Sequence, residues 1–113
     1  MATPTAHQPE LTSHEAVDQF ERAAKEHDDA ISHFNLGTAY YVAHNLDAAL
    51  GEFQRALSLS PDLGHAHYYL GVIFKMRGNT EDARKEFDRV LKGSSNMMLK
   101  NQATIQLQSM NGR

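Results

Sequence analysis

The chain has 113 residues, a formal net charge of −3 and no cysteine, and 41% of its residues are hydrophobic. This length suits one domain with a modest core, and the absence of cysteine excludes disulfide bonds, thiolate zinc sites and cysteine nucleophiles. Because the N-terminus has neither a basic region nor an apolar run, and no apolar stretch approaches the ~18 residues of a membrane span, we expect a soluble, cytoplasmic protein without a secretory signal.

The first predicted helix begins with a capping signal. Residues 1–12 are rich in proline and hydroxyl side chains, as is typical of a flexible N-terminal tail. Thr12 and Glu15 then match a capping box, in which the hydroxyl and the carboxylate each accept a hydrogen bond from a backbone N–H of the first turn. The helix predicted over 13–27 has one apolar stripe, made of Ala16, Phe20, Ala23 and Ala24. We therefore expect this helix to pack against one neighbour and to cap the domain.

The two segments that follow, 30–63 and 64–97, repeat one another with a period of 34 residues. Aligned without gaps they share ten identities, whereas average residue usage predicts about two. The identical pairs are His33/His67, Leu36/Leu70, Gly37/Gly71, Asn45/Asn79, Ala49/Ala83, Glu52/Glu86, Phe53/Phe87, Arg55/Arg89, Leu57/Leu91 and Ser60/Ser94. A repeat of this length predicts a solenoid of stacked helix pairs and argues against an enzyme built around a unique active site.

Each repeat unit is predicted to contain two helices joined by a tight turn. The turns fall at residues 44–45 and 78–79, where Gly78 can adopt the left-handed backbone that ends a helix. His44 replaces that glycine in the first unit, so we expect its turn to be less relaxed. The segment 60–62, which contains a proline, ends the second helix of the first unit and leads into the next unit.

The last predicted helix, over 96–110, follows at the distance expected of a third unit. However, Thr104 and Ile105 stand where a Leu-Gly pair should be. The apolar residues of this helix line only one side of it, namely Leu99, Ala103, Leu107 and Met110. A terminal helix with a polar outer face keeps the exposed end of a short solenoid soluble, so we expect a second capping helix here.

These positions together resemble the tetratricopeptide repeat. The residues that carry the resemblance are Gly37, Ala49, Phe53, Ala56 and Pro61 in the first unit (30–63). The same places in the second unit (64–97) hold Gly71, Ala83, Phe87, Val90 and Ser95. The resemblance implies an all-α fold, a right-handed α-solenoid of antiparallel helix pairs with about six helices, in a single domain over residues 13–113. The glycines and alanines would lie where paired helices approach most closely, and the phenylalanines would fill the space between units. The family's frequent tryptophan at the fourth position of the unit is a histidine in both units, His33 and His67.

Members of this family generally bind a peptide or a helix of another protein on the concave surface made by the first helix of each unit. By the family's geometry, the residues facing that surface are Ile31, Phe34, Asn35, Thr38, Tyr41 and Val42 from the first unit and His65, Tyr68, Tyr69, Val72, Lys75 and Met76 from the second. Rigid aromatic side chains suit an apolar anchor, because they bury much area at little entropic cost. We therefore expect a non-enzymatic adaptor for protein–protein interaction. Phe34 and Thr38 replace the lysine and asparagine that the family's clamp for chaperone C-terminal carboxylates needs, which argues against that use.

Two alternatives stay open at this stage. The aromatic residues can instead be core residues, or a second copy or the N-terminal tail can cover them. In the other alternative the chain is a structural scaffold and a homo-oligomer. Residues 1–62 carry ten acidic and three basic side chains (−7), and residues 63–113 carry four acidic and eight basic (+4), so end-to-end stacking would be charge-complementary.

We expect no metal, cofactor or nucleic acid to bind. His65 and His67 are two residues apart, so on a helix they point to different sides and do not readily share an ion. The cations of the second half are diluted by Glu81, Asp82, Glu86 and Asp88, which argues against a nucleic-acid surface. No nucleophile motif, phosphate-binding loop or dinucleotide fingerprint is present, and the repeated Glu/Arg pairs read as solvated helix faces.

Overall fold

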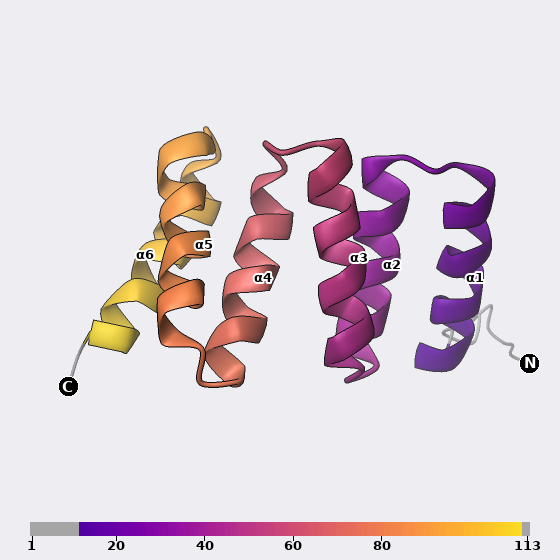
Figure 1. Ribbon diagram of the computed structural model, residues 1–113, viewed down its shortest axis with the longest axis horizontal. Coiled ribbons are helices and arrows are strands. Elements are labelled where there is room, and N and C mark those ends of the chain that lie inside the picture. The colour runs from indigo at the N-terminus through magenta and orange to yellow at the C-terminus, as the bar shows by residue number, and fades with distance from the viewer. Residues whose placement is uncertain (1–11, 112–113) are drawn as a thin grey trace, which may run out of the picture.

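The computed structural model describes residues 12–111, which form six helices and no strand. The helices are α1 (Ser13–Glu26), α2 (Ala30–Val42), α3 (Leu46–Leu59), α4 (Gly64–Met76), α5 (Thr80–Gly93) and α6 (Met97–Asn111). They stand side by side in chain order, with α1 and α6 at opposite ends of an elongated molecule of 55 × 34 × 27 Å (Figure 1). The predicted all-α solenoid of paired helices is confirmed. The predicted N-terminal tail lies outside the described residues except for Thr12.

The first helix starts where the capping signal placed it. The backbone N–H of Glu15 donates to Thr12 Oγ1, and the backbone N–H of Thr12 donates to Glu15 Oε1, both over 3.0 Å. These two bonds satisfy donors that a helix start otherwise leaves unpaired. The helix ends at Glu26, one residue before the predicted end, and α6 runs one residue later than predicted at both ends.

The turns inside the two units use the left-handed backbone. Gly78 has a φ of 80° and His44 a φ of 66°, so the histidine occupies a conformation that glycine adopts without strain. Pro61 lies in the link between α3 and α4 rather than in a helix, since α4 begins only at Gly64. The positive φ of His44 shows where the turn of the first unit is less relaxed than that of the second.

Within each unit, a glycine of the first helix packs against a phenylalanine of the second. A Cβ atom added at Gly37 would lie 2.9 Å from the Phe53 ring, and one added at Gly71 would lie 2.6 Å from the Phe87 ring. Both rings have no exposed surface. These rings fit only because the facing helix carries no side chain at this position. This close approach explains why glycine is repeated there.

The repeated histidine forms a polar contact in the place of the family's tryptophan. The Nδ1 atom of His33 lies 2.7 Å from Glu52 Oε1, and the Nδ1 atom of His67 lies 2.7 Å from Glu86 Oε1. Each pair joins the first helix of a unit to its second helix. The first and second helices of each unit are thus held together by an ion pair at one level and by the glycine and phenylalanine contact at another.

Candidate partner-binding surface

The first helices of the units, α2 and α4, carry all the residues predicted to face a partner. In Figure 1, α3 lies in front of α2 and α5 lies in front of α6, so the two rows of the solenoid are visible. Most of the predicted residues fall into three groups: rings packed between α2 and α4, exposed apolar side chains, and polar side chains that contact α6.

The aromatic residues form a continuous ladder centred on Tyr69. Its ring stacks on Phe53, with centroids 5.2 Å apart and planes at 4°. It also meets Tyr41 edge-on at 5.2 Å and Phe34 at 6.0 Å. Burial raises the pKa of Tyr69, so its hydroxyl stays neutral. Tyr69 and Phe34 therefore join the two units as well as lining the surface, a double role that their positions in the repeat did not reveal.

Three residues of the predicted set are largely exposed hydrophobic side chains. Ile31, Val42 and Met76 expose between 56% and 59% of their surface. Ile31 and Val42 lie at the two ends of α2, about 16 Å apart along a helix that rises ~1.5 Å per residue. The exposed apolar surface is therefore spread along α2, with the half-buried rings of Phe34 and Tyr41 between its ends.

The polar residues on α4 contact the last helix. The ammonium of Lys75 donates to Gln106 Oε1 and to Ser109 Oγ, both at 2.8 Å. The amide of Gln106 donates to the Tyr68 hydroxyl at 3.1 Å. The last helix therefore belongs to this surface, although Gln106 and Ser109 were not among the predicted residues. The signal was present, because one further period of 34 residues places Gln106 opposite Val72 and Ser109 opposite Lys75.

The remaining predicted residues have mixed environments. The hydroxyl of Thr38 donates to the carbonyl oxygen of Phe34 within α2, over 3.0 Å. Val72 is half-buried against the core around Phe87. Asn35 is half-buried, and its side-chain amide makes no hydrogen bond to any of residues 12–111. Its amide group is thus available to a backbone that approaches α2.

His65 is exposed and meets Phe34 edge-on, with centroids 6.4 Å apart. Among residues 12–111, no group of three or more histidine, aspartate or glutamate side chains is placed to hold a metal ion. In the same part of the chain, no helix has the length and apolar character needed to cross a membrane.

Comparisons with known proteins assign the family. The sequence profile of the tetratricopeptide repeat family matches residues 13–64 and, overlapping with them, residues 41–97. These matches cover most of the chain, and the chain belongs to the tetratricopeptide repeat family. Members of this family generally act as non-enzymatic interaction modules or scaffolds, so the partners that the fold implies are other proteins.

Among solved structures, the chain is similar to the protein in the "Crystal structure of MamA", with a TM-score of 0.68 and 20% sequence identity. The similarity covers 73% of this chain and 48% of that one, so the chain spans about half the length of MamA. At this identity the likeness supports the fold alone. No curated protein sequence matches the chain.

Proposed function

We propose that this chain is an adaptor that binds an apolar peptide or helix of another protein on the surface formed by α2, α4 and α6. The observation that carries the proposal is the aromatic ladder on α2 and α4. The ring contacts of Tyr41 and Phe34 with Tyr69 fix the rings before any partner arrives. A partner then loses less conformational entropy on this surface than on one made of mobile side chains.

The chemistry of the surface favours an apolar ligand over an acidic one. Ile31, Val42 and Met76 offer exposed hydrophobic contacts beside the rings. Lys75 is the one cation of the predicted set, and its ammonium already contacts two side chains of α6. An acidic peptide terminus would therefore find little to pair with, whereas an amphipathic helix could place apolar residues along α2.

The test uses exposed residues, because their replacement leaves the core intact. A variant with Ile31→Glu and Val42→Glu changes two side chains that make few contacts, and it should lose partners that need an apolar surface. Leu59→Glu on α3 is the control, since Leu59 is also exposed (41%) but lies on the other row of helices. Proteins captured from a host extract by the native chain and by Leu59→Glu, but not by the double variant, would support the surface.

Capture of the same proteins by all three chains would contradict the proposed binding surface. Circular dichroism of each variant should show unchanged helix content, because surface substitutions usually change stability by less than ~0.5 kcal/mol.

The alternative, charge-driven end-to-end stacking, has less support from the described residues. The end of the stack is α6, and Lys100 is the only charged side chain among residues 97–111. The other described cations of the second half lie on or next to α4 and α5, several of them in ion pairs. A basic end face that would meet an acidic α1 is therefore missing from the described residues.

A further inference from the structure

A cavity of about 570 Å³ lies between the two repeat units, on the side formed by α3 and α5. Its walls are α3, the link between α3 and α4, the start of α4 and the last turns of α5. Leu57 and Leu70 supply apolar walls, Arg89 and Lys92 supply positive charge, and Asp62 and Glu86 also line the cavity. This volume is in the range of small-ligand or side-chain sites, which bury an apolar group and orient it with a few polar groups.

The first unit indicates which group fits the polar part of this cavity. There, the carboxylate of Asp28 lies 2.6 Å from His33 Nε2 and 2.9 Å from a guanidinium nitrogen of Arg55. The corresponding residues one period later are Asp62, His67 and Arg89. In the first unit, a carboxylate therefore joins the histidine to the arginine.

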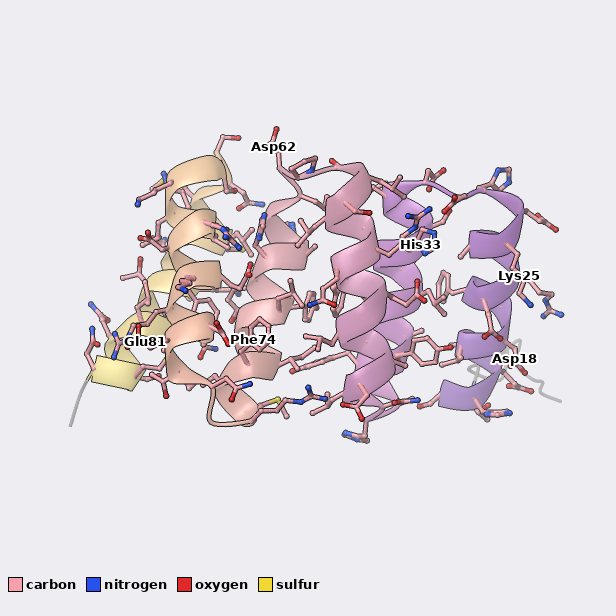
Figure 2. The ribbon with its side chains drawn as sticks, viewed as in Figure 1. Asp18, Lys25, His33, Asp62, Phe74 and Glu81 are labelled. Carbon is pink, nitrogen blue, oxygen red and sulfur yellow. The ribbon has the colours of Figure 1, made fainter. Side chains whose placement is uncertain are left out.

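The second unit lacks this carboxylate at the same place. The link before α4 has four residues (60–63), whereas the link before α2 has three (27–29). In the second unit, the carbonyl oxygen of Pro61 accepts from His67 Nε2 at 2.8 Å, where Asp28 contacts His33 in the first unit. Asp62 points away from the helices (Figure 2), and it makes no ion pair with any of residues 12–111. The carboxylate position of the first unit is thus unfilled by the second unit's own aspartate.

The cations beside this position keep donors for another acceptor. Arg89 donates to Glu86 Oε2 at 2.8 Å, and a guanidinium carries five N–H groups. Lys92 pairs with Asp88 at 2.8 Å, which leaves its ammonium with further donors. Glu86 has both oxygens engaged, one by His67 and one by Arg89. His67 has both ring nitrogens engaged as well, so the donors left for another acceptor are those of Arg89 and Lys92.

Two residues that line the cavity differ from their counterparts in the first unit. Lys92 corresponds to Ser58, and Gly93 corresponds to Leu59. A Cβ atom added at Gly93 would meet nothing within 4 Å, so this position borders open space. The second unit thus combines an added cation with a missing side chain at the mouth of the cavity.

We propose that this inter-unit cavity binds an acidic side chain of a partner peptide, with an adjacent apolar side chain of that peptide against Leu57 and Leu70. The incoming carboxylate takes the place that Asp28 has beside the arginine of the first unit, and it pairs with Arg89 and Lys92, while Pro61 keeps its contact with His67. This site lies apart from the aromatic surface of α2 and α4 and acts independently of it.

The test is an NMR titration of the ¹⁵N-labelled full chain with the peptide acetyl-Ala-Leu-Asp-Leu-amide. Saturable shifts at the amides of Leu57, Arg89, Lys92 and Gly93 support the proposal. The neutral peptide acetyl-Ala-Leu-Asn-Leu-amide should bind at least about five-fold more weakly, because it lacks the charge that strengthens the hydrogen bonds. Equal binding of the two peptides, or shifts confined to α2 and α4, would overturn it.

Substitutions that introduce the residues of the first unit test whether the cavity itself binds the peptide. Lys92→Ser and Gly93→Leu should each weaken binding of the acidic peptide about five-fold or more, since one removes a charge and the other places a side chain at the mouth. Gly51→Leu is the matched control, because Gly51 is another exposed helical glycine with nothing within 4 Å of its Cβ position. Unchanged affinity in Gly93→Leu, or equal loss in Gly51→Leu, would refute the assignment.

The last measurement is a titration of the same labelled chain with octanoate. A fatty acid offers the same pairing of a carboxylate with an apolar chain but no peptide backbone. Octanoate that binds more weakly than the acidic peptide supports a peptide occupant. Octanoate that binds more tightly at the same amides would overturn the peptide and assign the cavity to a small amphiphile.

Discussion

His67 and Glu86 lie 2.7 Å apart in a geometry that favours a histidine with protons on both ring nitrogens. The Nε2 atom of His67 contacts the carbonyl oxygen of Pro61, which can only accept a hydrogen bond, so this nitrogen is a donor. The Nδ1 atom contacts the carboxylate of Glu86 at 2.7 Å, and this contact also needs a donor. The hydrogen bond to Glu86 accordingly raises the pKa of His67, against the opposing effect of burial.

This pair predicts a pH dependence of stability. A histidine whose pKa is higher in the folded state than its ordinary value of about 6.5 stabilises the fold fully below that value, and the contribution is lost as the pH rises through the folded-state pKa. His33 acts in the same direction: burial lowers its pKa, but the hydrogen bonds to Glu52 and Asp28 outweigh burial and raise it. The free energy of unfolding should therefore fall as the pH is raised from about 6.5 through the folded-state pKa values of the two histidines.

Urea denaturation at a series of pH values checks this dependence. His67→Gln should reduce the slope, because it removes one of the two titrating groups. His65→Gln is the control, since His65 is exposed and makes no ion pair within residues 12–111, and it should keep the native slope. A native slope in His67→Gln would show that the pair with Glu86 does not couple to folding.

The glycines in helices should respond to alanine with opposite signs. Gly71→Ala places a methyl group 2.6 Å from the Phe87 ring, so the ring or the helix has to move, and we expect a loss of about 1–3 kcal/mol. Gly51→Ala meets no neighbour and improves helix propensity, so we expect a gain of up to about 1 kcal/mol. Thermal and urea unfolding of the two variants measure the difference. A neutral Gly71→Ala would mean that the helices separate more easily than this packing implies.

The turn at His44 offers a stabilising substitution. His44 has a φ of 66°, and a side chain in this left-handed region costs about 1–2 kcal/mol of folding free energy. Glycine avoids this cost, but its greater conformational freedom in the unfolded chain offsets part of the gain. His44→Gly should therefore raise the free energy of unfolding by several tenths of a kcal/mol to about 1 kcal/mol. Gly78→Ala, at a φ of 80° in the second unit, should lower it. If His44→Gly destabilises the protein, the His44 side chain makes an interaction that offsets its backbone strain.

Much of the architecture was predictable because it depends on local and periodic features. The capping box at Thr12 and Glu15 needs only residues three apart, and it forms as predicted. The repeated Gly37 and Phe53, with Gly71 and Phe87 one period later, identify the contact between paired helices. Such features recur with the chain's own period, so a single sequence contains the comparison needed to recognise them.

The candidate surface was predictable only in outline. The period placed Phe34, Tyr41 and Tyr69 on the first helices, but not the stacking of Tyr69 on Phe53 that makes it part of the core. It also left out Gln106 and Ser109, because α6 departs from the glycine pattern although these two residues follow Val72 and Lys75 by one period. Contacts between units depend on the angle and distance at which the helices stack, and a repeat pattern specifies neither.

The sequence by itself determined that this protein is a short stack of tetratricopeptide units, since a 34-residue period of small and aromatic residues has few other ways to bury its apolar faces. Only the tertiary structure decided which contacts the identical residues of the two units make. His33 and His67 occupy the same position, yet one contacts the carboxylate of Asp28 and the other the carbonyl of Pro61. The physical reason is the backbone of the link before α4, where the carbonyl oxygen of Pro61 contacts His67 and Asp62 makes no ion pair with any of residues 12–111.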